Sequence, residues 1–150
     1  VVCAVVLGQL ERARELVAQR QSVAALFDRA VRGSTRLIPQ RTPSGSEHSY
    51  WTYAVRLDSD RPETDWPRFR TMFLAHGGDP YYAAWKLSYD EPLFQREIQR
   101  MPGVWQAYRP GLCPNAEYLQ PRLVQFKTNY WELPEAERQA EILQRTLGEW

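Results

Sequence analysis

The apolar residues at the start of the chain follow the spacing of a helix. They recur at alternating intervals of about three and four residues, with charged and amide side chains on the other faces. Gly33 then supplies a stop, because glycine accepts the left-handed conformation that ends helices. The pattern predicts one long helix over residues 1 to about 32. Its apolar series is Val6, Leu10, Ala13, Val17, Ala24, Phe27 and Val31, with Arg20 in the single polar slot.

The first turns of this helix, VVCAVVL, are apolar on every side. The run is too short for a membrane span, which needs about 20 apolar residues. It also lacks the preceding basic stretch of a secretory signal. A helix that is apolar all round is normally buried, either in an internal core or against another domain or subunit. In the second case, we expect Val1 to Leu7 to be covered by a neighbouring copy or to be poorly ordered.

Further along, alternation replaces the helical period. Residues 48–58, HSYWTYAVRLD, alternate with period two and are rich in β-formers, as are residues 122–131, RLVQFKTNYW. Residues 79–89 carry a third extended, aromatic pattern, although two alanines leave strand against helix open. Helical patterns precede the Gly77–Gly78 pair and close the chain, and residues 34–47 indicate an exposed loop. The order predicts an α+β fold: a three-stranded antiparallel or mixed sheet with helices on one side.

Composition limits the class of function. The 150 residues suit a single domain, and a net charge of +1 argues against a dedicated nucleic-acid binder. The two cysteines, Cys3 and Cys113, have no metal-ligand spacing and indicate reduced thiols in the cytoplasm. The sequence contains no phosphate-binding glycine loop, paired-histidine metal motif or nucleophile elbow. Motifs alone therefore assign no enzyme class, and no metal site is expected.

Five segments of the chain are distinctive when taken in order: AVVLGQLERARELVAQR, HSYWTYAVRL, the helix ending in Gly-Gly, CPNAEYLQPRLVQF and PEAERQAEIL. Together they resemble one known family, the DegT/DnrJ/StrS sugar aminotransferases. They come in the family's order and at similar spacing, over nearly the whole chain, but match only the C-terminal portion of that family. The aromatic segments YYAAWKLSY and FKTNYW depart from the commoner family pattern and resemble its aminohydroxybenzoate-synthase-like and perosamine-synthase-like branch.

The resemblance implies a pyridoxal-phosphate (PLP) enzyme of fold type I, a cytoplasmic homodimer that transfers an amino group to a keto carbon of a nucleotide-linked sugar. Residues 1–33 would be a connecting helix truncated at its start, and residues 34–150 the small C-terminal domain. The large PLP-binding domain would be absent, and with it the Schiff-base lysine. Neither Lys86 nor Lys127 matches that lysine in order or surroundings. The chain alone is therefore expected to bind no cofactor and to be inactive.

The same resemblance implies that this portion contributes to substrate selection. Tyr81 and Tyr82 take the place of the family's His-Tyr pair, so that their hydroxyls and rings could hold a sugar or phosphate. His48 stands where the family often has a histidine, and Asp79 is expected only to form a turn. Homodimer contacts are expected through Val1–Leu7 and the cleft face. The predicted substrate-binding set is Tyr81, Tyr82, Trp85, Lys86, His48, Lys127, Asn129 and Tyr130.

Two alternatives remain. The chain could belong to a sister PLP-dependent sugar dehydratase, which differs at the upstream lysine position. It could instead be a freestanding, non-catalytic module that binds a sugar nucleotide or another protein through its aromatic surface. The reading frame upstream of Val1 distinguishes the freestanding module from the other two.

Overall fold

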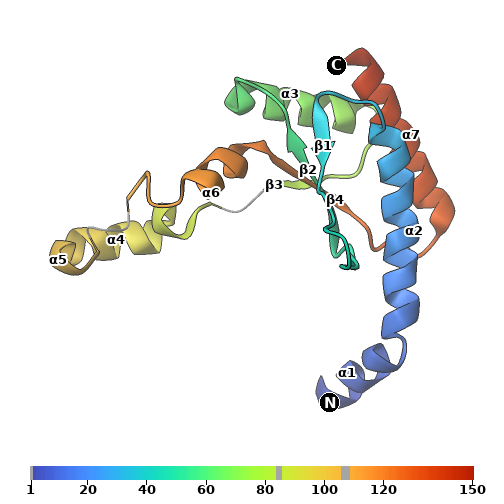
Figure 1. The fold of residues 1–150 in the computed structure, drawn as a ribbon, viewed down its shortest axis with the longest axis horizontal. Helices are drawn as coiled ribbons and strands as arrows, with labels where there is room; N and C mark the ends of the chain where they lie inside the picture. Colours follow the sequence, from blue (N-terminus) through green and yellow to red (C-terminus); the bar gives the residue numbers. More distant parts are fainter. Residues whose placement is uncertain (1, 84–85, 106–108) are drawn as a thin grey trace.

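The computed structural model describes residues 2–83, 86–105 and 109–150, and its centre is a four-stranded antiparallel sheet in the order β1-β2-β4-β3 (Figure 1). Strands β2 and β4 form the longest pairing, in which Tyr53 lies opposite Phe126 and Val55 opposite Val124. The strands are β1 (Leu37–Pro39), β2 (Thr52–Leu57), β3 (Tyr82–Ala83) and β4 (Leu123–Lys127).

The helices lie on both sides of this sheet. In Figure 1, α2 and α7 run side by side along one face, α3 crosses its upper end, and α4 and α5 project away on the other side. The helices are α1 (Val2–Glu11), α2 (Ala13–Val31), α3 (Pro62–Ala75), α4 (Pro92–Arg100), α5 (Pro102–Trp105), α6 (Pro114–Leu119) and α7 (Leu133–Glu149), with short 3-10 turns at Ser88–Asp90 and Gln120–Arg122.

The core lies between the sheet and the α2, α3 and α7 helices. Alternate residues of β2 and β4 are buried, as a half-covered strand requires. Phe27 of α2 stacks on both Tyr53 and Phe126, with ring centroids 5.5 and 5.3 Å apart. Phe73 of α3 meets Phe126 edge-on at 5.4 Å. These aromatic contacts pack α2 and α3 against the β2–β4 pair.

The α+β class is confirmed, and so are the strands expected in residues 48–58 and 122–131. The sheet has one strand more than expected. Strand β1 lies within the predicted loop and pairs with the end of β2, Leu37 opposite Leu57. This strand was not predicted because its three residues are too few to show alternation, and the surrounding Ser-, Pro- and Gly-rich composition indicated a loop.

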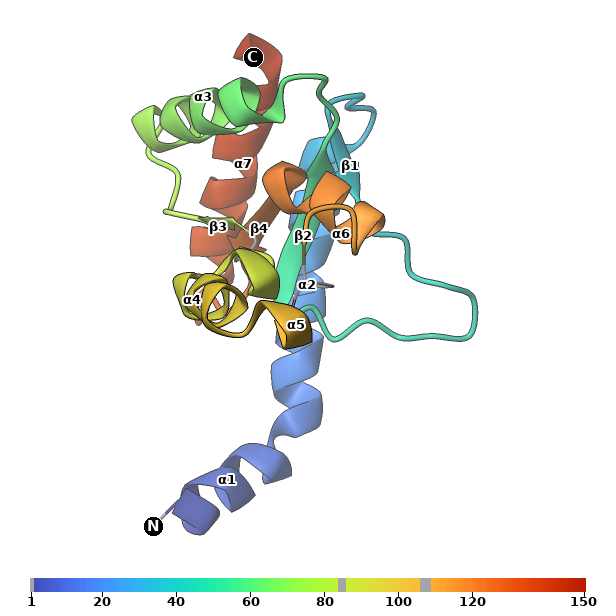
Figure 2. The same ribbon diagram turned by 90° about the vertical axis from the view of Figure 1, so that its left-hand side faces the viewer.

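The single long N-terminal helix was a wrong prediction. The helical path breaks at Arg12, whose backbone angles (φ −101°, ψ 6°) lie outside the helical region. Helix α1 has no buried residue, whereas α2 packs on α7 and buries Val23, Leu26 and Phe27. Figure 2 shows α1 turned aside from the axis of α2, at the far end from the core. Packing against the core therefore fixes the direction of α2, whereas α1 has no such contact to hold it in line with α2.

The apolar residues of α1 are not covered by their own chain. Val2 is 75% exposed, and Val5, Val6, Leu7 and Leu10 are all more than half exposed. This agrees with the expectation that another surface covers them, which stays a prediction. None of the described helices combines the length and the apolar character needed to cross a lipid bilayer.

Gly78 marks the tightest approach of backbone to core. A Cβ at this position would lie 2.3 Å from the ring of Phe73, which is 1% exposed. We predict that Gly78→Ala lowers the free energy of unfolding by about 1–3 kcal/mol, because the buried ring has no free space to move into. Gly148→Ala is the matched control, since nothing lies within 4 Å of its added Cβ. Urea unfolding checks both, and an unchanged midpoint for Gly78→Ala would contradict the packing.

Candidate functional site

The end of β4 brings together a small group of charged and polar side chains. Lys127 Nζ lies 3.3 Å from Asp79 Oδ2 and 4.3 Å from the ring centroid of Tyr130. The Tyr130 hydroxyl donates to the same carboxylate oxygen at 2.9 Å. Asp79 thus receives two donors from one segment of chain. We call Asp79, Lys127, Thr128 and Tyr130 the β4-end cluster.

Asp79 is itself held by helix α7. Its backbone N–H donates to Oε1 of Gln139 at 2.7 Å, and Gln139 is 1% exposed. A buried amide that binds a main-chain group fixes the turn after Gly78, and with it the direction of the carboxylate. Burial raises the pKa of Tyr130 above its ordinary value, and the neighbouring Asp79 raises it further. Tyr130 is therefore a neutral donor at physiological pH.

The loop that precedes β2 lies beside this cluster. His48 Nδ1 accepts the backbone N–H of Tyr50 at 2.7 Å, so Nε2 carries the proton of the neutral ring. That Nε2 lies 3.3 Å from Oε1 of Gln40, and the imidazole stacks on the Tyr50 ring at 4.1 Å. Both ring nitrogens of His48 are thus occupied within the chain. In this arrangement His48 shapes the loop.

Thr128 joins the loop to the strand end. Its fully buried hydroxyl lies 2.6 Å from the carbonyl of Tyr50 and 3.0 Å from that of Trp51. The Arg20 guanidinium donates to the same hydroxyl at 3.0 Å and to the Trp51 carbonyl at 2.9 Å. Tyr50 has a left-handed backbone (φ 49°), which costs a bulky residue about 1–3 kcal/mol. These bonds to Thr128 and Arg20 hold the strained segment in place.

The other predicted site residues take different places in the fold. Tyr81 is 4% exposed and packs among Trp66, Phe73 and Phe126, and its buried hydroxyl has no partner among the described groups. Tyr82 lies in β3 opposite Gln125. Of the remaining predicted site residues, Lys86 and Asn129 are exposed and Trp85 lies outside the described residues.

Sequence reasoning named Lys127 and Tyr130 as substrate-binding residues, which stays a prediction, and it missed the groups that organise them. Asp79 was expected only to form a turn, and nothing in its local sequence shows that two donors converge on it. Gln139 did give a signal, because it is an amide between Ala136 and Ala140 on the buried face of α7. Arg20 gave a signal as the one polar residue in the apolar series of its helix, but Thr128 gave none, since its contacts are with residues far away in the sequence.

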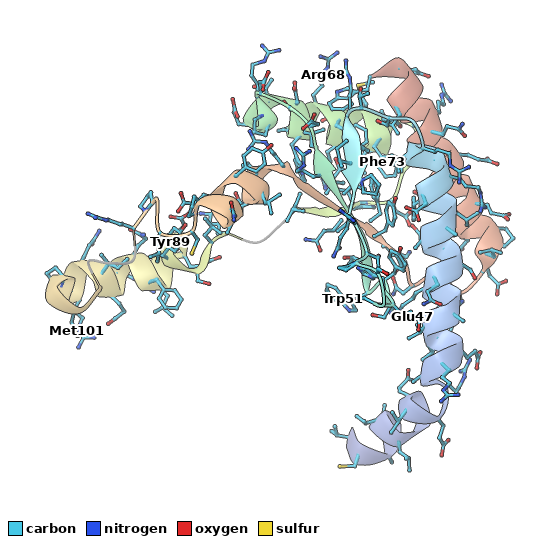
Figure 3. The ribbon with its side chains drawn as sticks, viewed as in Figure 1. Glu47, Trp51, Arg68, Phe73, Tyr89 and Met101 are labelled. Atoms are coloured by element: carbon cyan, nitrogen blue, oxygen red, sulfur yellow. The ribbon has the colours of Figure 1, made fainter. Side chains whose placement is uncertain are left out.

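A shallow hollow of about 640 Å³ borders the same loop on its α2 side. Gln21 closes one wall by donating to Glu47 Oε1 at 2.7 Å and to the His48 carbonyl at 3.1 Å. Figure 3 shows Glu47 and Trp51 together at the end of the sheet away from α3. The hollow is lined by Ala13, Arg14, Val17, Ala18, Gln21, Glu47 and Ser49. This end of the molecule has the concave, mixed surface on which a small polar ligand can rest.

Comparison with known proteins places these features in a wider context. Residues 1–129 match the model of the DegT/DnrJ/EryC1/StrS aminotransferase family. No curated protein gives a significant sequence match. Among solved structures, the fold is similar to PseC from Helicobacter pylori, an aminotransferase of pseudaminic acid biosynthesis. That similarity has a TM-score of 0.73 at 16% identity, over 96% of this chain and 36% of that one.

Two further structures show the same likeness. The sugar aminotransferase CalS13 from Micromonospora echinospora gives a TM-score of 0.69 at 19% identity, covering 96% of this chain and 33% of its own. The synthase of 3-amino-5-hydroxybenzoic acid gives 0.67 at 19% identity, with 95% and 37% covered. The chain thus spans about a third of the length of these structures. At these identities the likeness shows the fold.

The contrast between Tyr81 and Tyr130 yields a testable prediction. Burial raises the pKa of Tyr81, so the folded state binds its proton more tightly than the unfolded state does. Stability from this group is present below the ordinary tyrosine pKa of about 10 and is lost as pH rises above it. Tyr81→Phe should not lower stability near neutral pH and should raise it by up to about 1 kcal/mol, because it removes a buried hydroxyl that has no partner among the described residues.

Above pH ~10, Tyr81→Phe should become still more stable relative to the parent, since it removes one source of alkaline unfolding. Tyr130→Phe should instead lose about 1 kcal/mol near neutral pH, because its hydroxyl bonds the Asp79 carboxylate. Urea unfolding at a series of pH values measures both. Tyr118→Phe is the exposed comparison: Tyr118 is 49% exposed and its hydroxyl accepts only a surface hydrogen bond from Arg56 at 3.0 Å, so its loss should be small. Equal losses at neutral pH for Tyr81→Phe and Tyr130→Phe would contradict these assignments.

Proposed function

The chain belongs to the DegT/DnrJ/EryC1/StrS aminotransferase family, and on that premise we propose that it is the C-terminal portion of a PLP-dependent enzyme that aminates keto groups of nucleotide-linked sugars. The observation that carries the proposal is the family match over residues 1–129. The fold shared with sugar aminotransferases over nearly the whole chain supports it. The proposed enzyme is cytoplasmic and acts as a homodimer.

The two lysines of this chain do not fit the role of the Schiff-base lysine. That lysine must spend part of its time as a neutral amine directed into a protected site. Lys127 is instead engaged as a cation, by the Asp79 carboxylate at 3.3 Å and by the Tyr130 ring. Lys86 is exposed at the base of the projecting α4 segment. Covalent binding of the cofactor therefore belongs to a part of the enzyme outside these residues.

This chain would contribute polar contacts to the substrate. Lys127 is 40% exposed, so its ammonium can reach a phosphate while it stays close to Asp79. Asn129 is exposed beside it and offers both a donor and an acceptor to sugar hydroxyls. Tyr130 orients Asp79 and, through it, the lysine. His48 would act by fixing the loop that borders the β4-end cluster.

Reductive trapping tests whether covalent binding of PLP lies outside this chain. The chain is incubated with equimolar PLP, treated with borohydride and analysed by mass spectrometry. We expect no more pyridoxyl-lysine in the folded chain than in the urea-unfolded chain. A stoichiometric label on the folded chain that disappears in Lys127→Ala or Lys86→Ala would show that this portion holds the cofactor itself.

The gene provides the positive arm of the same test. We expect the reading frame to continue upstream of the codon for Val1 and to encode a PLP domain with its lysine. The product of that complete frame should transfer the amino group of glutamate or glutamine to a keto carbon of a nucleotide-linked sugar. A frame that starts at Val1, or a histidine in place of the lysine, would contradict the proposal, and the second would favour the dehydratase.

A further inference from the structure

Two tryptophans stand out on the surface at the end of the β2–β4 pair. Trp51 is 76% exposed and Trp131 is 73% exposed, more than any other large apolar side chain described outside α1. Trp51 directly precedes β2, and Trp131 lies four residues beyond the end of β4. Thr52, the first residue of β2, pairs with Lys127, the last residue of β4. The two tryptophan-bearing segments therefore leave the sheet at the same end of this strand pair. Indole rings are seldom left in water unless a partner covers them.

One turn of helix α2 holds both tryptophans. Gln19 Nε2 donates to the carbonyls of Tyr130 and Trp131, at 2.7 and 3.1 Å. The next residue, Arg20, donates to the carbonyl of Trp51 at 2.9 Å. Adjacent side chains of one helix thus fix the main chain under each indole. The two exposed rings have a rigid base in common, which lowers the entropy lost when they bind something.

The main chain at Trp51 is held by more contacts than Arg20 alone provides. Its carbonyl also lies 3.0 Å from the buried hydroxyl of Thr128, and the preceding residue, Tyr50, is held in a left-handed backbone conformation. Strain of this kind persists where surrounding contacts enforce it, and it is concentrated at functional positions. The position of Trp51 is therefore a specified feature of the fold.

We propose that Trp51 and Trp131 form an aromatic platform on which the nucleobase of a nucleotide-linked sugar stacks, with its diphosphate directed toward Lys127. The proposal rests on the proposed function and names the part of the substrate that this surface holds. Indole is the largest flat side chain and stacks on any base without hydrogen-bond readout. Lys127 supplies the complementary charge one residue before Thr128, which braces Trp51.

The charges at this end of the molecule restrict how a diphosphate can approach. The acidic groups here include Asp79, Glu47, Glu132 and Glu135, and the Glu135 carboxylate contributes to the raised pKa of Tyr130. Asp79 is bonded to Lys127 and Tyr130, and Glu47 accepts from Gln21 at 2.7 Å. Glu132 is exposed and follows Trp131 directly. A diphosphate therefore has to approach Lys127 on its exposed side, away from the Asp79 carboxylate.

Binding of uridine diphosphate (UDP), UDP-glucose and glucose 1-phosphate to the chain, measured by calorimetry, tests the platform. The parent should bind UDP and UDP-glucose with similar affinity and glucose 1-phosphate much more weakly, because the base supplies the stacking. Trp51→Ala and Trp131→Ala should each weaken UDP binding roughly tenfold. Trp51→Phe should retain much of the affinity, since it keeps a flat ring.

Leu93→Ala is the control, because Leu93 is an exposed apolar residue on the projecting helix α4. It should leave every affinity unchanged. The platform is refuted if both tryptophan variants bind UDP as the parent does, or if the parent binds neither UDP nor UDP-glucose. It is also refuted if the variants change only self-association in sedimentation, since the surface would then serve a second copy. None of these outcomes alters the trapping result, so the proposed function is judged separately.

Discussion

The antiparallel pairing of β2 with β4 is the constraint on which the rest of the molecule depends. Its register places Tyr53 opposite Phe126 on the face that α2, α3 and α7 cover. The same register places Thr52 opposite Lys127, where the polar residues gather. A slip of one residue would turn the aromatic residues of one strand to the other face and separate Thr128 from the loop it holds. One set of backbone hydrogen bonds therefore determines both the core and the candidate site.

The polar end of this pair is built by contacts between segments that are distant in sequence. Asp79 lies after α3, and Gln139 belongs to α7. Lys127 is the last residue of β4, and Tyr130 lies just beyond it. Arg20 of α2 and Thr128 then hold the segment that ends in Trp51. Gln139 and Thr128 are fully buried, and these bonds satisfy polar groups that would otherwise be costly to bury. The result is a braced, partly exposed surface that carries Lys127 and two indoles.

Local pattern was enough to predict the elements whose sequence is regular over many residues. The alternation around Tyr53 and Phe126 gave the two main strands, and the period of α7 gave the last helix. Strand β1 was missed because three residues show no period. The break at Arg12 was missed because it depends on where packing begins, and α1 has no packing of its own. Lys127 and Tyr130 were predicted as site residues through family resemblance, and that role stays a prediction. Asp79 and Thr128 act through long-range contacts that no local pattern records.

The central claim is that the loop before β2 and the end of β4 form one ligand-binding surface. Amide chemical-shift mapping by NMR during a titration with UDP-glucose tests it most directly, because every segment of the chain reports independently. The largest changes should fall together on residues 48–51 and 127–131, with α1 and α4 unaffected. Changes confined to α1 or α4, or to only one of the two segments, would contradict it.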